Sequence, residues 1–152
     1  MANKEKLLEF LKSKKLLVIA SHSDKTWISN VFYGIDDNFR IYFVSPKSAE
    51  HSQQISRNPD IAFSVVWYNE KNHGDRKGVQ GKGTCRLARD DEEIRKGVEL
   101  HNKNFPEFAG RITFDWIKNN EFNSRIWVIE PKSIKYWDDQ LYGDDETEEF
   151  EF

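Results

Sequence analysis

The sequence of 152 residues predicts a mainly β protein, an antiparallel β-barrel with flanking helices. Two observations carry this prediction. About six or seven short segments rich in Val, Ile, Phe, Tyr and Trp are separated by polar or glycine-containing turns. Helical patterns occur only near the ends of the chain and at one connection, whereas a parallel sheet needs a helix between most pairs of strands. This arrangement favours a barrel built from hairpins.

The first part of the chain predicts a helix followed by three strands. Leu and Phe at helical spacing indicate a helix over residues 4–14, and the apolar run 16–20 indicates a strand. Residues 27–33 alternate in character, so the odd-numbered side chains should share one face of a second strand. The acidic turn 36–38 then leads into a third strand over 41–44, which makes a hairpin.

The middle of the chain predicts a short helix and a second hairpin. The helix covers residues 49–57 and ends at Asn58-Pro59, because proline cannot continue a helix and restricts the residue before it. A strand over 61–67 and a polar loop over 69–76 precede a strand over 79–87. Three glycines in and beside that last strand indicate a bulge or a close approach of backbone: Gly78, Gly81 and Gly83.

The last part of the chain predicts helices and a final long strand. Asp90 is a candidate N-cap with Glu three residues later, and the helix that follows should end before Pro106. Residues 113–119 indicate one more short helix, and residues 125–137 a strand with a kink at Pro131.

Charge is unevenly distributed along the chain. Residues 143–152 hold six of the 26 acidic residues and none of the 23 basic ones, so residues 1–142 carry a net charge of +3. We expect residues 1–142 to form one domain and residues 143–152 an acidic, disordered tail. The single Cys85 cannot form an internal disulfide, and no apolar run reaches the length of a membrane helix. A cytoplasmic location and no membrane partner are therefore expected.

A candidate anion site follows the third predicted strand. The loop Ser45-Pro-Lys-Ser-Ala-Glu-His51 brings hydroxyl groups and a lysine to the start of a helix. Backbone N–H groups and the helix dipole favour a phosphate at such a point. Ser45, Lys47, Ser48 and His51 are the candidate ligands, and the alternative is an ordinary turn with a solvated lysine.

Five segments together resemble the pyridoxamine 5′-phosphate oxidase-like, FMN-binding split-barrel superfamily, over about residues 4–138. Their order and spacing carry the resemblance more than any one of them. They are Trp27-Ile-Ser-Asn-Val-Phe-Tyr33, Ile41-Tyr-Phe-Val-Ser45, Arg57-Asn-Pro-Asp60, Lys77-Gly-Val-Gln-Gly-Lys-Gly83 and the closing Ile129-Glu-Pro-Lys-Ser-Ile-Lys-Tyr-Trp137.

The resemblance implies a six-stranded split barrel and a homodimer that binds flavin in a cleft between its subunits. It places the second strand beside the isoalloxazine ring, the loop 45–51 at the FMN phosphate, and other positions at the ring edge or near the partner's flavin. The residues implied for the ring are Ser29, Asn30, Val31, Gln80 and Trp137. For Asn30, Gln80 and Trp137 a structural role fits equally well, and Tyr33 and Trp67 are expected in the core.

The chain departs from the oxidase itself at the phosphate. That enzyme uses an Arg on the second strand and an Arg-Lys pair at the helix start, where this chain has Ser29 and Glu50-His51. Glu50 would repel a phosphate, and a neutral histidine replaces a fixed cation poorly. Lys47, Ser48 and the helix N-terminus could compensate. Oxidation of pyridoxamine phosphate is therefore not expected.

The leading functional prediction is a flavin-dependent oxidoreductase that acts on a small molecule, with FMN performing the chemistry and no catalytic residue assigned. The alternative is a non-catalytic or stress-related protein that binds FMN, haem or a deazaflavin on the same barrel. The four histidines and Cys85 lack metal-ligand spacing, so no metal site is expected. The dispersed basic residues and the acidic tail disfavour nucleic-acid binding.

Overall fold

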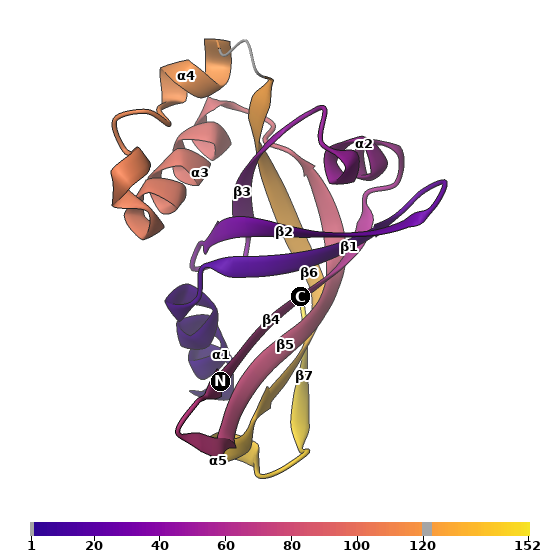
Figure 1. The fold of residues 1–152 in the computed structure, drawn as a ribbon, viewed down its shortest axis with the longest axis vertical. Helices are drawn as coiled ribbons and strands as arrows, with labels where there is room; N and C mark the ends of the chain where they lie inside the picture. Colours follow the sequence, from indigo (N-terminus) through magenta and orange to yellow (C-terminus); the bar gives the residue numbers. More distant parts are fainter. Residues whose placement is uncertain (1, 120–122) are drawn as a thin grey trace.

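Six strands close into a barrel in the computed structural model, which describes residues 2–119 and 123–152. Neighbouring strands follow the order β3-β2-β1-β4-β5-β6-β7, and an additional pairing of β3 with β6 closes the ring of the first six (Figure 1). All pairings are antiparallel. The strands are β1 (Leu16–His22), β2 (Thr26–Ile35), β3 (Ile41–Pro46), β4 (Asp60–Asn69), β5 (Asn72–Leu87), β6 (Ser124–Asp138) and β7 (Thr147–Glu151). The expected split barrel is confirmed, with one strand more than the six expected.

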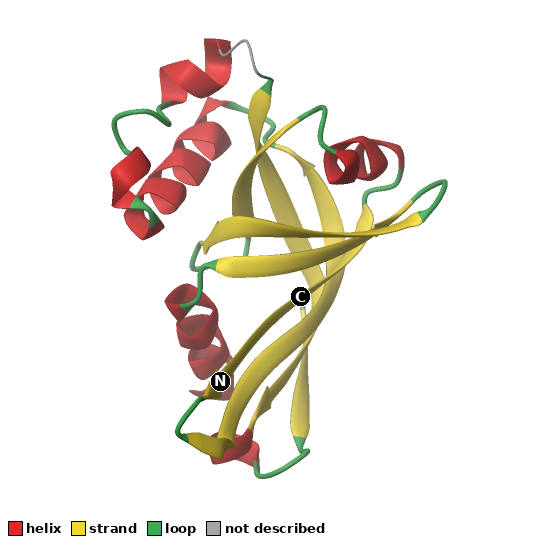
Figure 2. Ribbon diagram, viewed as in Figure 1, coloured by secondary structure: helices red, strands yellow, loops and turns green. Residues whose placement is uncertain are grey.

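Helices cover the ends and one side of this barrel (Figure 2). α1 lies against the lower barrel, α2 covers the upper end near the β1–β2 turn, and α3 and α4 pack together on the opposite side (Figure 1). The described helices are α1 (Ala2–Ser13), α2 (Glu50–Arg57), α3 (Asp91–Asn104), the 3₁₀ turn η1 (Pro106–Phe108), α4 (Phe114–Asn119) and α5 (Asp139–Tyr142). None of the helices within residues 2–119 and 123–152 is long and apolar enough to cross a membrane.

The long strand β6 makes the closure possible. Its 15 residues pair with β3 at one end, with β7 at the other, and with β5 along most of their length. The β5–β6 register shifts between Lys82 and Gly83, opposite Pro131. Such a shift bends the strand and increases its twist, which a small barrel requires. The register shift confirms the bulge that the glycines of β5 predicted.

Two apolar clusters hold the elements together. The larger fills the barrel and includes Leu17, Tyr33, Phe43 and Trp127, each no more than 1% exposed. The smaller lies between the outside of the barrel and the α3–α4 pair and is centred on Ile126. Seven of the 21 buried residues that the structure describes in the larger cluster are aromatic, and aliphatic side chains make up most of the rest.

The acidic C-terminal segment differs from the expected disordered tail. Residues Thr147–Glu151 pair with β6 as strand β7, and Phe150 packs against the barrel core. Beyond it, the Phe152 ring lies 4.9 Å from that of Phe39, and Lys4 Nζ lies 4.4 Å from the Phe152 centroid. The charge of this segment concealed an alternation in which Glu149 and Glu151 are exposed, whereas Glu148 and Phe150 are partly buried on the other face.

The second hairpin also differs from expectation. β5 begins at Asn72, so residues expected to form a polar loop continue the ladder with β4 across a tight turn. The Asn69 and Asn72 side chains accept backbone N–H groups of Lys71 and Gly74, which stabilises the turn. The polar composition reflects exposure on both faces of a projecting hairpin rather than a loop.

Candidate functional site

The predicted phosphate loop is ordered by a hydrogen bond between its two ends. Ser45, at the end of β3, and His51, in the first turn of α2, contact each other through Ser45 Oγ and His51 Nε2 at 2.7 Å. Trp127 Nε1 donates to the Ser45 carbonyl at 3.0 Å, and the Phe43 ring lies beside the imidazole. Burial lowers the pKa of His51. The imidazole is therefore neutral at pH 7 and supplies a hydrogen bond rather than a charge.

The start of α2 has free hydrogen-bonding capacity. Its N-cap residue, Ala49, has no side chain that can accept from the first N–H groups of the helix. Lys47 and Ser48 are exposed immediately before it. Lys47 N donates to the Asn123 carbonyl at 3.0 Å, which anchors the loop to the start of β6. An anion at this point would meet backbone donors, one hydroxyl and one mobile ammonium group.

Glu50 is less of an obstacle to an anion than the sequence indicated. Its carboxylate lies 3.2 Å from Lys25 Nζ, in the turn between β1 and β2. Gln54 Nε2 also donates to it, at 3.5 Å. The negative charge of Glu50 is thus directed toward Lys25 and partly compensated by it.

The three β2 residues expected to contact the flavin ring do not lie on one face of the strand. Ser29 and Val31 point inward and Asn30 points outward, as the alternation of the strand requires. The Ser29 hydroxyl is buried without a hydrogen-bond partner among the described residues, and so is that of Ser52 on α2. A buried hydroxyl without a partner costs about 1–3 kcal/mol relative to a paired one. A ligand atom that reached the Ser29 hydroxyl would remove that cost.

Gln80 and Trp137 lie together, but in a different place. Both line a pocket of about 270 Å³ between β5, β6 and the start of α5, and none of the loop residues 45–51 contributes to it. Gly78 pairs with Trp137 across the ladder, and a Cβ at Gly78 would overlap the indole ring. The glycine therefore fixes where Trp137 lies. Within one chain, the predicted residues form two separate groups.

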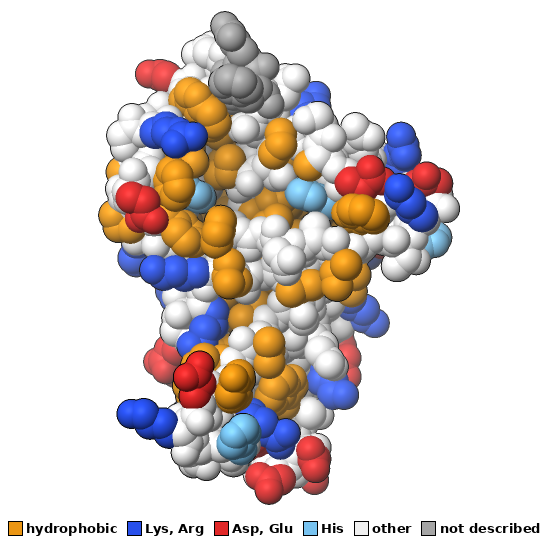
Figure 3. All heavy atoms as spheres, in the orientation of Figure 1, with side chains coloured by type: hydrophobic (Ala, Val, Ile, Leu, Met, Phe, Trp, Pro, Cys, Tyr) orange, Lys and Arg blue, Asp and Glu red, His pale blue; other side chains and the backbone are white. Residues whose placement is uncertain are grey.

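An apolar outer face lies on strands β1, β2 and β4. We define it by five side chains that point away from the barrel and are at least half exposed: Leu16, Ile28, Phe32, Val66 and Tyr68. The backbone pairings place these strands next to one another. Figure 3 shows apolar side chains distributed over the side of the molecule on which β1 and β2 cross the barrel. An exposed apolar surface of this kind is typical of an interaction site.

The sequence itself contains a signal for this face. Even-numbered positions of β2 should be polar if they face water, but of the three between residues 27 and 33, Ile28 and Phe32 are large and apolar. Among the described residues, no group of three or more His, Cys, Asp or Glu side chains could hold a metal ion.

Comparison with known proteins identifies the family. The family model described as pyridoxamine 5′-phosphate oxidase matches residues 4–138. This chain belongs to that family. A search of curated proteins finds no match.

Solved structures share the family's split barrel at low sequence identity. A heme-binding protein from Mycobacterium smegmatis superposes with a TM-score of 0.71 at 15% identity, over 91% of this chain. The chain spans about half of that protein, 53% of its length. A NimC/NimA family protein from Clostridium acetobutylicum gives 0.66 at 17% identity, over 97% of this chain and 91% of its own. HutZ, the heme storage protein from Vibrio cholerae, gives 0.63 at 13% identity, over 97% and 93%.

Proposed function

We propose that two copies of this chain form a homodimer that binds FMN between its subunits and acts as an oxidoreductase on a small molecule. The observation that carries the proposal is the geometry of the loop 45–51, where an uncapped helix start, a free hydroxyl and a free lysine lie together. The family membership supports the same assignment, because the resemblance to the FMN-binding split barrels implies the FMN phosphate at this loop.

The residues of this loop can hold a phosphate group, but they offer it fewer positive charges than the oxidase does. Lys47, Ser48 and the first N–H groups of α2 would hold the phosphate oxygens. Ser45 and His51 would position these groups through their mutual hydrogen bond rather than bind the anion as cations. One lysine in place of several fixed charges predicts weak binding of the phosphate and strong dependence on salt.

Bound flavin would supply hydride or electron transfer. The chain would orient the ring: the exposed Asn30 amide, on the outer face of β2, would hydrogen-bond to its edge. Gln80 and Trp137 would complete the site from the second subunit, which accounts for their separation from the loop within one chain. The apolar outer face would form the interface and exclude water from the ring.

The test is a titration of the purified protein with FMN and, separately, with riboflavin, which lacks the phosphate. We expect quenching of flavin fluorescence, one flavin per chain, a dimeric mass by light scattering, and affinity for FMN at least tenfold above that for riboflavin. Lys47→Gln should reduce this preference, whereas Lys15→Gln, which changes an exposed lysine in the connection between α1 and β1, should not. Equal affinity for FMN and riboflavin would exclude the loop as the phosphate site.

Haem is the second candidate, because two of the structural neighbours are described as heme-binding and heme storage proteins. The same titration distinguishes the two cofactors. A Soret band that saturates at one haem per chain, without any quenching of FMN fluorescence, would replace the flavin proposal by the haem one. Loss of that band in His51→Ala would indicate His51 as the axial ligand, since its neutral imidazole is the form that binds iron.

A further inference from the structure

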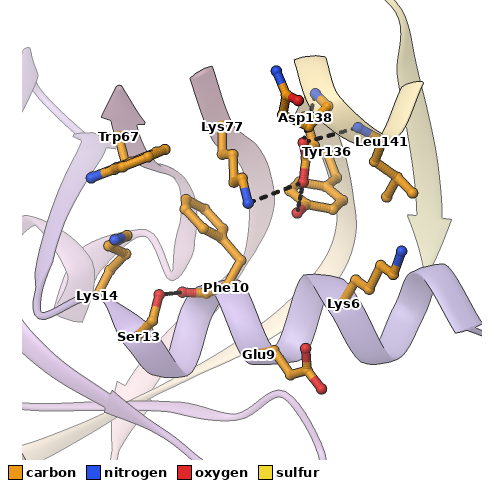
Figure 4. Close-up of a pocket in the computed structure, with 11 residues that line it drawn as sticks. Lys6, Glu9, Phe10, Ser13, Lys14, Trp67, Lys77, Tyr136, Asp138 and Leu141 are labelled. Atoms are coloured by element: carbon orange, nitrogen blue, oxygen red, sulfur yellow. Dashed lines mark hydrogen bonds and ion pairs between the residues drawn. The ribbon is translucent and has the colours of Figure 1, made fainter. Parts of the chain in front are cut away.

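A second pocket lies at the end of the barrel opposite α2, between α1 and the ends of β4, β5 and β6. Its volume is about 570 Å³, within the range of small-molecule sites in proteins. Figure 4 shows residues of α1 facing residues of β4, β5 and β6 across the opening, and Leu141 of α5 also lines the pocket. None of the residues predicted for the flavin contributes to its lining.

The wall of this pocket is aromatic. The Phe10 and Tyr136 rings stack with centroids 5.8 Å apart and an interplanar angle of 24°. Both are buried, whereas the Trp67 indole is only half-buried and stands at the rim. Figure 4 shows the Trp67 ring above the end of Lys14, on the open side of the pocket. A planar ligand could therefore extend the existing stack of rings.

Two lysine ammonium groups lie close to the Trp67 indole. Lys14 Nζ lies 5.0 Å from the Trp67 centroid and Lys77 Nζ lies 5.9 Å from it. Burial and the charge of Lys77 lower the pKa of Lys14. Two ammonium groups beside one partly buried ring repel each other unless an anion lies near them.

The carboxylates nearby do not supply that anion. Asp138 lies 3.6 Å from Lys77 Nζ, but it also accepts from the Tyr136 hydroxyl at 2.9 Å and caps α5. Glu9 on α1 also lines the pocket, but within the part of the chain that the structure describes it forms no ion pair with Lys14 or Lys77. Among the described residues, no carboxylate lies within 4 Å of Lys14 Nζ. The charge of Lys14 therefore remains available to a ligand.

We propose that this pocket binds a small aromatic anion, an aromatic carboxylate or phosphate monoester. The anionic group would lie between Lys14 and Lys77, and the ring would pack on Trp67. The Asp138 carboxylate would hold Lys77 in place without competing for Lys14. This site is separate from the proposed flavin site, so its occupant would be an effector rather than the cofactor or the substrate of the flavin.

The test is isothermal titration of the full chain with phenyl phosphate as the probe, alongside inorganic phosphate and phenol. We expect saturable binding of phenyl phosphate at one site per chain, and about tenfold weaker binding of each fragment alone. Lys14→Gln should weaken phenyl phosphate about tenfold, whereas the neighbouring Lys15→Gln should leave it unchanged. Circular dichroism of both variants verifies that they fold.

A third variant separates this site from the flavin site. Lys47→Gln should leave phenyl phosphate binding unchanged, because Lys47 lies at α2 and not in this pocket. Weakened binding in that variant would place the probe at the loop 45–51 and overturn the proposal. Equal affinities for wild type and Lys14→Gln, or the absence of saturable heat, would overturn it as well, whatever the flavin titrations give.

Discussion

Removal of one apolar side chain from the outer face should dissociate the proposed dimer without unfolding the subunit. The most sensitive position is Ile28, which is 69% exposed in the single chain and lies near the start of β2. Ile28→Ser removes its apolar surface and adds no charge. Because the side chain contacts little else in its own chain, the free energy of unfolding of the monomer should change by less than about 0.5 kcal/mol.

The size of the effect follows from the exposed surface. Complete burial of an isoleucine side chain contributes roughly 1.5–3 kcal/mol. Since 69% of Ile28 is still exposed, burial of the rest in an interface would contribute about 1–2 kcal/mol per copy. A two-fold dimer contains the substitution twice, so the loss is about 2–4 kcal/mol. That loss raises the dissociation constant of the dimer roughly 30- to 1,000-fold.

Sedimentation equilibrium of wild type and Ile28→Ser over a range of concentrations measures this constant directly. Phe152→Ser is the matched control, because Phe152 is also exposed and apolar but lies beyond β7 and outside the outer face. The control should dimerise like wild type. If Ile28→Ser dimerises as tightly as wild type, or if wild type is a monomer, the outer face is not the interface and the two-subunit site loses its support.

Three further predictions concern the fold and the site. Burial raises the pKa of Cys85 to about 12, so a thiol reagent at pH 8 should label it only as fast as the chain unfolds; rapid labelling of folded protein would contradict this. Because burial lowers the pKa of His51, the unfolded chain binds a proton at this imidazole more readily than the folded chain does. Stability in urea should therefore fall as the pH drops below about 6.5. His51→Gln should lose part of that pH dependence, whereas a substitution of the exposed His22 should retain the pH dependence. Gly83→Ala should cost about 1–3 kcal/mol of stability in urea, because the new Cβ would overlap the β6 backbone, while the same change at Gly110, where a Cβ meets nothing within 4 Å, should cost far less.

Most of the fold followed from patterns within single elements. The alternation in β2, the N-cap at Asp90 and the glycine at the β5 bulge are local signals. Each depends on residues close in the chain, so the sequence displays them directly. Strand β7 was not predicted, because its pairing partner, β6, lies ten or more residues away in the chain. In addition, six acidic residues in a segment of ten indicated disorder more strongly than its two phenylalanines indicated a strand.

The candidate site was predictable only in part. The loop 45–51 was recognisable as a hydroxyl-rich helix start, but the bond between Ser45 and His51 and the pairing of Glu50 with Lys25 were not. These contacts depend on how α2 packs on the barrel. The same packing decides that His51 is neutral, which no count of charges in the sequence reveals.

The sequence by itself determined the order of helices and strands, their approximate ends and the resemblance to a split barrel, because these depend on periodicity and on turn residues. The tertiary structure decided which side chains meet. It placed Gln80 and Trp137 apart from the phosphate loop, and it brought Lys14 and Lys77 to one indole from α1 and β5. Burial, pKa and the position of a free charge depend on contacts between residues far apart in the chain, and only closure of the barrel creates those contacts.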